Sequence, residues 1–214
     1  MLRILKYVFF CLLLVMAGIG AWSVFGRQTD SGPLTVVIDP GHGGSDPGAT
    51  WNGAEEKNLN LAVALKVRSL LEEEVDIDIQ VLMTREEDVF VSLYDRAEFA
   101  NEKNADLFLS IHANALENNH DYEGIMTFYH KSDRRGKELA EQVQGAVLKE
   151  TGGKDRGSKE EDYVVIRETK APACLLEMGF ITTQSELDRL LSPEYQDRIA
   201  AGIVQGILAY QNGI

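Results

Sequence analysis

Four side chains of types that bind metal ions or move protons stand where predicted strands end or where a helix begins. His42 follows an apolar strand in IDPGHGG, His112 ends another in LFLSIHAN, and Glu177 ends a third in ACLLEMGF. Glu56 opens the helix after a glycine-rich loop. Two imidazoles and a carboxylate favour zinc, and a catalytic zinc typically has three protein ligands. We therefore expect His42, Glu56 and His112 to hold one zinc ion. Glu177 is then free to accept a proton from water as general base.

Each of these signals is weak when it is taken alone. A histidine after a strand is more often a hydrogen-bonded structural residue than a ligand. A glutamate at a helix start also interacts favourably with the helix dipole, so the residues alone do not separate Glu56 from Glu55. Glu177 is more informative, because a carboxylate in an apolar stretch is costly without partners. The glycine-rich loop lacks the spacing of the known phosphate-binding motifs, which disfavours a phosphate site.

The elements that must position these residues alternate between strands and helices. Apolar, often β-branched runs predict strands over 34–39, 79–84, 105–112, 124–129, 163–166 and 173–177. Helical spacing predicts helices over 57–74, 92–104, 133–150, 183–191 and 193–211. This pattern is typical of an α/β domain, with a mostly parallel twisted sheet of about six strands and helices on both faces. Sites in such sheets form beyond the carboxyl ends of the strands.

The chain from residue 36 onward carries a series of blocks that together resemble a known family. The blocks are VVIDPGHGG (36–44), DPGA (46–49), EKNLNLA (56–62), LMTR (82–85), RAEFAN (96–101), SIHAN (110–114) and LEMGFI (176–181). In this order they resemble the zinc-dependent N-acetylmuramoyl-L-alanine amidases of bacterial cell-wall metabolism, the amidase 3 family. The resemblance covers essentially the whole domain.

The resemblance implies roles for individual residues. It makes His42, Glu56 and His112 the zinc ligands, with Glu56 chosen over Glu55, and it makes Glu177 the catalytic carboxylate. The implied reaction is hydrolysis of the amide between N-acetylmuramic acid and L-alanine in peptidoglycan, during cell-wall remodelling.

Further candidate residues and two rival functions complete the expectations. Arg167 and Asn114 are further candidates for contact with the substrate, and Arg156 is a weaker one. One alternative is another zinc-dependent peptidoglycan peptidase or amide hydrolase. The second is a non-catalytic, membrane-tethered wall-binding protein, against which the complete set of four site residues argues.

The charge of the chain is divided unevenly between its ends. The formal net charge is −13, and residues 1–27 contain three basic residues and no acid, so that the rest carries −16. An acidic balance argues against nucleic acid as a partner. The two cysteines, Cys11 and Cys174, are too few for a disulfide framework. No protein partner can be inferred.

An uncharged apolar run covers residues 7–25, after Arg3 and Lys6. Its length as a helix is roughly 28 Å, close to the bilayer core. We expect residues 1–27 to form a single-pass signal anchor with its N-terminus inside, residues 28–33 a linker, and residues 34–214 the catalytic domain. The domain would then lie at the outer face of the cytoplasmic membrane. The alternative is a cleaved signal peptide and a secreted or periplasmic protein, although no clear small-residue cleavage site is present.

Overall fold

The computed structural model of the chain describes residues 32–213. The predicted anchor over residues 7–25 and most of the predicted linker lie outside the described residues. Within the described range, no helix has the length and apolar character needed to cross a membrane. The residues from Pro33 onward form one structural unit.

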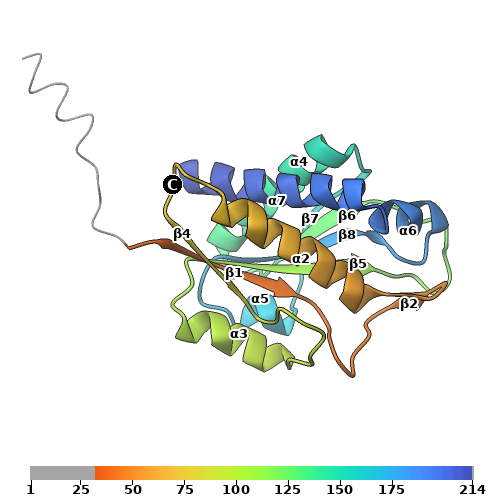
Figure 1. Cartoon of the computed structure of the whole chain (residues 1–214), viewed down its shortest axis with the longest axis horizontal. Helices are drawn as coiled ribbons and strands as arrows, with labels where there is room; N and C mark the ends of the chain where they lie inside the picture. The colour runs from red at the N-terminus through yellow and green to blue at the C-terminus, as the bar shows by residue number, and fades with distance from the viewer. Residues whose placement is uncertain (1–31, 214) are drawn as a thin grey trace, which may run out of the picture. The chain divides into compact units, whose positions relative to one another are not determined.

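A six-stranded sheet in the order β4-β1-β5-β8-β6-β7 runs through the centre of this unit (Figure 1). Its strands are β1 (Leu34–Pro40), β4 (Ile79–Met83), β5 (Leu107–Asn114), β6 (Ile125–Tyr129), β7 (Asp155–Glu160) and β8 (Ala173–Phe180). The first four strands in the sheet order are parallel, whereas β6 runs antiparallel to β8 and parallel to β7. The predicted mostly parallel sheet is therefore confirmed. Its four parallel strands bring their carboxyl ends to one edge.

Two parts of the predicted strand assignment are wrong. Residues 163–166, predicted as a strand, lie mostly in the short helix α5 (Val164–Arg167). The sixth strand of the sheet is instead β7, which has the polar sequence DRGSKE and leaves its ends exposed at the edge of the sheet. The glycine-rich loop also contains a small hairpin of β2 (Thr50–Trp51) and β3 (Ala54–Glu55).

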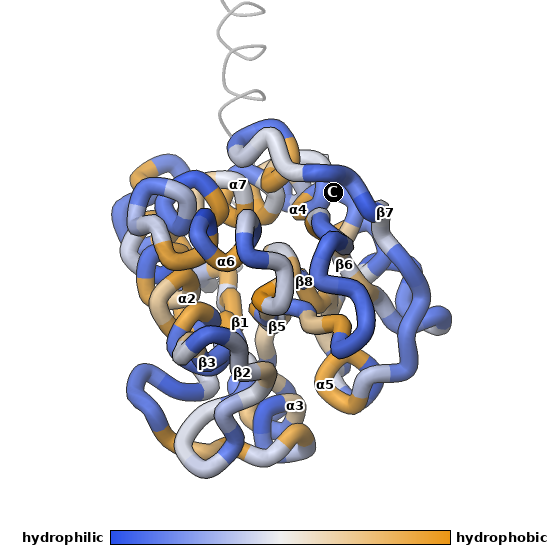
Figure 2. The backbone as a smooth tube through the Cα atoms, turned by 90° about the vertical axis from the view of Figure 1, so that its right-hand side faces the viewer, coloured by the Kyte–Doolittle hydropathy of each residue, from blue (hydrophilic) through white to orange (hydrophobic). Residues whose placement is uncertain are grey.

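Helices cover both faces of the sheet, as the strand pattern predicts. One face is covered by α2 (Glu56–Glu72), α4 (Arg134–Thr151) and α7 (Pro193–Asn212), and the other by α3 (Leu93–Glu102) and α5 (Figure 1). The short helix α6 (Gln184–Leu190) follows β8. Apolar segments of the tube lie mainly along the strands and the helix sides that meet them (Figure 2). Two buried apolar clusters result, one on each face of the sheet.

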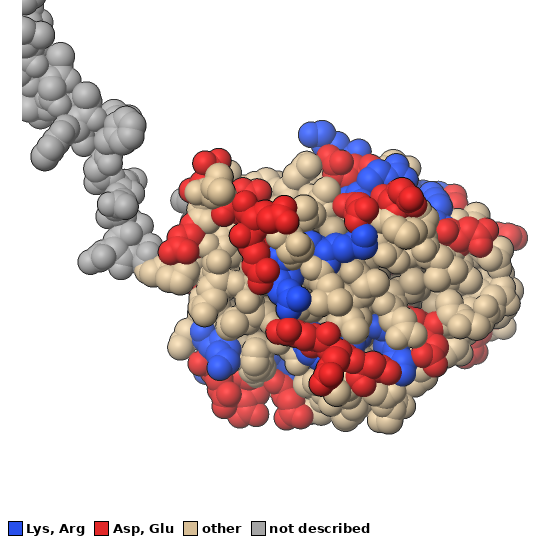
Figure 3. Space-filling view, in the orientation of Figure 1, with Lys and Arg blue, Asp and Glu red and all other residues tan. Residues whose placement is uncertain are grey.

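Local signals fix several helix ends. The Ser92 side chain caps α3 by accepting a hydrogen bond from Asp95 N. Gly152 ends α4 in the left-handed conformation, with φ of 65°. On the outside, acidic side chains are spread over the face seen in Figure 3, with basic ones between them. That face offers no broad basic patch to an anionic polymer.

Candidate metal centre

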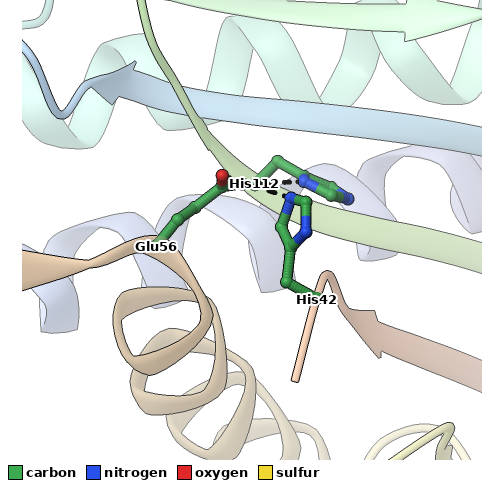
Figure 4. A group of neighbouring side chains, drawn as sticks. All are labelled: His42, Glu56 and His112. Carbon is green, nitrogen blue, oxygen red and sulfur yellow. Dashed lines mark hydrogen bonds and ion pairs between the residues drawn. The ribbon is translucent and has the colours of Figure 1, made fainter. Parts of the chain in front are cut away.

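The three predicted ligands meet at the carboxyl edge of the sheet. His42 follows β1, His112 lies near the end of β5, and Glu56 is the first residue of α2. One potential ligand atom from each of the three lies within 4.8 Å of the others. Figure 4 shows the Glu56 carboxylate pointing toward both imidazole rings. Glu56 Oε1 is 2.8 Å from His112 Nδ1, and Glu56 Oε2 is 3.2 Å from His42 Nε2.

Two glycines leave the space in which these side chains converge. A Cβ atom at Gly41 would lie 2.1 Å from Cε1 of the His112 ring. A Cβ atom at Gly48 would lie 2.6 Å from both Glu56 Oε2 and His42 Cδ2. Real Cβ atoms do not approach other atoms so closely, so any other residue at either position would displace a ligand. The residues around the cluster therefore fit a bound divalent ion.

The Glu56 carboxylate is held in its ionised form, as a metal ligand must be. Burial alone would raise its pKa, but hydrogen bonds and charge from His112 and His42 outweigh burial and hold the pKa well below its usual value. Backbone donors also stabilise the charge, since Ala49 N donates to Oε2 and Ala113 N donates to Oε1. The position of Glu55 is different: its carboxylate interacts with Lys57 and Asn58 on the surface. Glu56 is thus the member of the pair that faces the cluster.

A carboxylate outside the predicted set orients His42. Asp46 Oδ2 lies 2.8 Å from His42 Nδ1, and because an ionised carboxylate only accepts, Nδ1 carries the proton. The other ring nitrogen, Nε2, is then the one that faces Glu56. Burial lowers the pKa of His42, but Glu56 and Asp46 together raise it above its usual value. The signal in the sequence was a carboxylate four residues after a candidate ligand.

Two buried arginines hold the backbone of the His42 loop. Arg96 donates through Nη1 to Pro40 O and through Nη2 to His42 O, at 2.8 and 2.7 Å. Arg85 donates to Pro40 O and Gly41 O at 2.9 and 3.0 Å. His42 itself has a φ of 60°, which a non-glycine residue adopts only when its surroundings hold it there. The arginines therefore fix the direction in which this ligand leaves the loop.

Asp39, at the end of β1, in turn fixes Arg96. Arg96 Nη1 donates to Asp39 Oδ1 at 2.7 Å, and both side chains are almost completely buried. Burial by itself would raise the pKa of Asp39, but Arg96, Thr84 and Ser110 hold it below its usual value. Sequence reasoning missed this network. Its signal was the charged residue that closes an otherwise apolar strand, since such a carboxylate needs a partner.

Glu177 lies on β8 directly beside His112, its neighbour in the parallel register with β5. Its Oε2 atom is buried and has no hydrogen-bond partner among the described residues. Burial raises the pKa of Glu177 well above its usual value, and the negative charge of Glu56 raises it further. The structure thus brings the predicted catalytic carboxylate next to the predicted ligands, in an unpaired state.

The two predicted substrate contacts differ in their surroundings. Asn114, at the end of β5, places Nδ2 3.8 Å from Met126 Sδ, and Met126 is the cross-strand neighbour of Glu177. Arg167 forms ion pairs with Asp162 and Glu168, and neither of them belongs to the metal cluster. A substrate role for Arg167 and for Asn114 stays a prediction.

Comparison with known proteins agrees with this geometry. Residues 36–209 match the family model described as N-acetylmuramoyl-L-alanine amidase. The chain is 41% identical over 179 residues to YqiI, an uncharacterised protein of Bacillus subtilis, with 82% of this chain and 84% of that protein covered. It is 38% identical over 174 residues to the sporulation-specific N-acetylmuramoyl-L-alanine amidase of the same organism, with 81% and 67% covered.

A solved structure has the same fold. The crystal structure of N-acetylmuramoyl-L-alanine amidase from Clostridium difficile 630 matches with a TM-score of 0.82 and 43% sequence identity. The match covers 85% of this chain and 98% of that one. The resemblance first seen in the sequence blocks therefore extends to the fold and to nearly the whole of the domain.

Proposed function

The chain belongs to the N-acetylmuramoyl-L-alanine amidase family, and we propose how its metal centre performs the hydrolysis for which that family is named. The reaction splits the amide between the lactyl group of N-acetylmuramic acid and the L-alanine of the stem peptide in peptidoglycan. The observation that carries the mechanism is the convergence of His42, Glu56 and His112 beside a buried, unpaired carboxylate on the next strand.

We propose that the cluster holds one zinc ion. Two imidazoles and one carboxylate form a donor set that zinc enzymes use, and three protein ligands leave a coordination position open. When bound, the ion supplies Lewis acidity, which polarises the scissile carbonyl and lowers the pKa of water. The protein's part is to present an ionised Glu56 and a correctly oriented His42, and the hydrogen bonds described above support both.

Glu177 is the proposed catalytic residue. Its carboxylate accepts a proton from the water whose oxygen attacks the carbonyl carbon. As the carbon–nitrogen bond breaks, Glu177 delivers this proton to the nitrogen of L-alanine, so that a lactyl carboxylate and a free amine result. A raised pKa suits the exchange, because a general acid–base works best when its pKa lies near the operating pH.

Product analysis tests the reaction, and Glu177→Gln tests the mechanism. The full chain, purified in detergent, should release intact stem peptides with a free L-alanine amino group from purified peptidoglycan, as measured by mass spectrometry. Glu177→Gln should lose at least ~100-fold in turnover and still bind one zinc ion. A variant with wild-type turnover would overturn the assigned role. Cleavage within the stem peptide instead would point to a peptidase.

A pair of adjacent glutamates offers a matched test of the ligand set. Glu56→Gln should lose zinc binding, measured by competition with a chromophoric chelator. Glu55→Gln changes the same functional group one residue away, outside the cluster, and should bind zinc as the wild type does. Equal zinc affinity of the two variants would contradict the proposed ligands.

We also propose that the apolar run over residues 7–25 anchors the catalytic domain to the outer face of the cytoplasmic membrane. The support is the length of the run and the basic residues before it. Fractionation of cells that express the full chain tests this. The intact protein should sediment with membranes and resist extraction by high salt, whereas a shortened protein in the medium or periplasm would show that the segment is cleaved.

A further inference from the structure

Four exposed apolar side chains lie in the segment between β4 and the first turn of α3, and they take no part in the mechanism above. Val89, Phe90, Leu93 and Tyr94 fall within six consecutive residues, and their exposed fractions are between 41% and 62%. We call these four side chains the apolar rim. Exposed apolar groups gathered in one place often mark a surface that binds a ligand.

The rim is attached directly to the loop that carries His42. A Cβ atom at Gly44 would lie 2.6 Å from Phe90 N and 3.2 Å from Phe90 Cβ, so the two segments touch. Asp88 strengthens the contact, because it accepts hydrogen bonds from Gly44 N and from Lys57 Nζ at 2.7 and 2.9 Å. Gly44 is two residues from His42, which corresponds to at most ~7 Å of chain. The Phe90 end of the rim therefore lies against the loop that carries His42.

The chemistry of the substrate brings sugars to this place. In the amide that is hydrolysed, the carbonyl belongs to the lactyl group on the N-acetylmuramic acid ring, so the ring lies only a few bonds from the reacting carbon. The glycan strand must then run past the metal centre. A pyranose ring presents a face of C–H groups that packs on an aromatic ring, and a tyrosine hydroxyl adds a hydrogen bond. Building on the proposed function, we propose that Phe90 and Tyr94 form a subsite for the glycan strand next to the cleaved sugar.

One member of the rim, Tyr94, also borders a polar groove. Tyr94 lines a groove of about 500 Å³ that extends along α3 to the segment after α5. Its other walls include the side chains of Glu98, Glu102 and Lys170. Sugar hydroxyls and N-acetyl groups both donate and accept hydrogen bonds, so they match such a lining. An aromatic surface that leads into a polar groove suits a carbohydrate polymer.

A second copy of this chain fits the rim less well. A stable protein–protein interface buries ~800 Å² on each partner, and four partly exposed side chains fall well short of that area. The rim is also held in place before binding, by the contacts of Asp88 and by a hydrogen bond from Arg96 Nε to Val91 O. A preorganised aromatic surface loses little conformational entropy when it binds a ligand, which suits a small subsite.

The test compares two substrates that share the scissile amide. One is a long, uncrosslinked glycan strand that carries stem peptides, and the other is a single N-acetylmuramic acid that carries one stem peptide. In the full chain, Phe90→Ala/Tyr94→Ala should raise KM for the long strand roughly tenfold and leave kcat unchanged. Both parameters for the single sugar should stay within about twofold of the wild type.

Single variants separate aromatic stacking from general apolar contact. Phe90→Leu keeps an apolar side chain and should still raise KM for the long strand, whereas Tyr94→Phe keeps the ring and should retain most of the affinity. Val75→Ala is the control, because Val75 is highly exposed and precedes β4 at the end of the sheet opposite the metal centre. It should behave as the wild type.

Four results would overturn the subsite. One is an unchanged KM for the long strand in the double variant, when the wild type is active. Another is a double variant whose KM or kcat changes equally on both substrates, which would show that the rim acts on the reacting group. A change of oligomeric state in light scattering would make the rim an interface between copies. A wild type that is inactive on both substrates would overturn the proposed function itself, and the subsite with it.

Discussion

Substitution of Arg96 by methionine should lower the stability of the protein, because it leaves a buried carboxylate without its bonded cation. Asp39 and Arg96 are 0% and 2% exposed, and loss of one partner from a buried ion pair costs about 3–5 kcal/mol. Thr84 and Ser110 still donate to the Asp39 carboxylate, which places the expected cost near the lower limit. At about 3 kcal/mol, Tm should decrease by roughly 6–12 °C.

The same substitution should weaken metal binding. Arg96 Nη2 donates to His42 O, and this bond helps to hold His42 at its φ of 60°. When it is lost, the loop can relax toward commoner backbone conformations, in which the imidazole no longer points at Glu56. Loss of a group that orients a metal ligand typically reduces metal affinity 10–100-fold, and we expect a decrease in that range.

Two measurements and one control variant separate these effects. Thermal unfolding of the metal-free protein gives the change in stability, and competition with a chromophoric chelator gives zinc affinity at a temperature where every variant is folded. Leu139→Ala is the control, since Leu139 is fully buried on α4 and its truncation costs about 2–5 kcal/mol. That variant should lose similar stability and keep wild-type zinc affinity.

The reasoning would be refuted by equal zinc affinity in Arg96→Met and Leu139→Ala. A second check is the double variant Asp39→Asn/Arg96→Met, which removes both charges. It should be more stable than Arg96→Met, because no unpaired carboxylate remains buried. If the double variant were the less stable of the two, the cost would not come from the unpaired charge.

Three further predictions concern the same site. Asp46→Ala should weaken zinc binding about 10-fold, because the proton on His42 Nδ1 is no longer fixed; chelator competition measures this, and an unchanged affinity would contradict it. Gly41→Ala should abolish stoichiometric zinc binding, since its Cβ would collide with the His112 ring, and a variant purified with one zinc ion would show that the ring can move aside. Glu177→Gln should make the metal-free protein more stable at neutral pH, because it removes the cost of a buried negative charge close to Glu56. Folding raises the pKa of Glu177. The loss of stability caused by its ionisation is therefore absent below the unfolded pKa of about 4.3, and it grows as the pH rises toward the folded pKa. The difference in Tm between the two proteins should therefore be larger at pH 8 than at pH 5, and an equal difference would contradict the assignment.

The sheet could be predicted from strong local patterns, whereas the choice of Glu56 for the metal cluster needed the family resemblance as well. Buried parallel strands are continuous apolar runs, and the polar residues that follow them must gather at one edge. The edge strand β7 was not predicted, because an exposed strand does not need an apolar run. Its polar sequence, DRGSKE, is typical of a loop. The segment 163–166 was misassigned because a short apolar run packs equally well as a strand or as a helical turn.

The supporting network was not predicted, because its partners are distant in the sequence. Arg96 and Asp39 are 57 residues apart, and Arg96 lies on a helix whose other buried residues are small and apolar. A charged residue on a predicted helix is ordinarily placed on the solvent side. Only the closeness of β1 to the start of α3 shows that this guanidinium points inward to the carbonyl groups of the His42 loop.

Asp39 and Glu177 show why a buried carboxylate needs its surroundings before its role can be assigned. Both lie in apolar strands and reach the same edge of the sheet, so burial in an apolar run does not by itself distinguish their roles. Asp39 meets a guanidinium and two hydroxyl groups, which lower its pKa and make it a fixed structural anion. Glu177 keeps an unpartnered oxygen, and burial together with the charge of Glu56 raises its pKa. Protonation of a paired carboxylate costs the free energy of its hydrogen bonds and ion pair. Protonation of an unpaired, buried carboxylate is favourable, because it removes a buried charge. This contrast supports Glu177, rather than Asp39, as the proposed proton-transfer group.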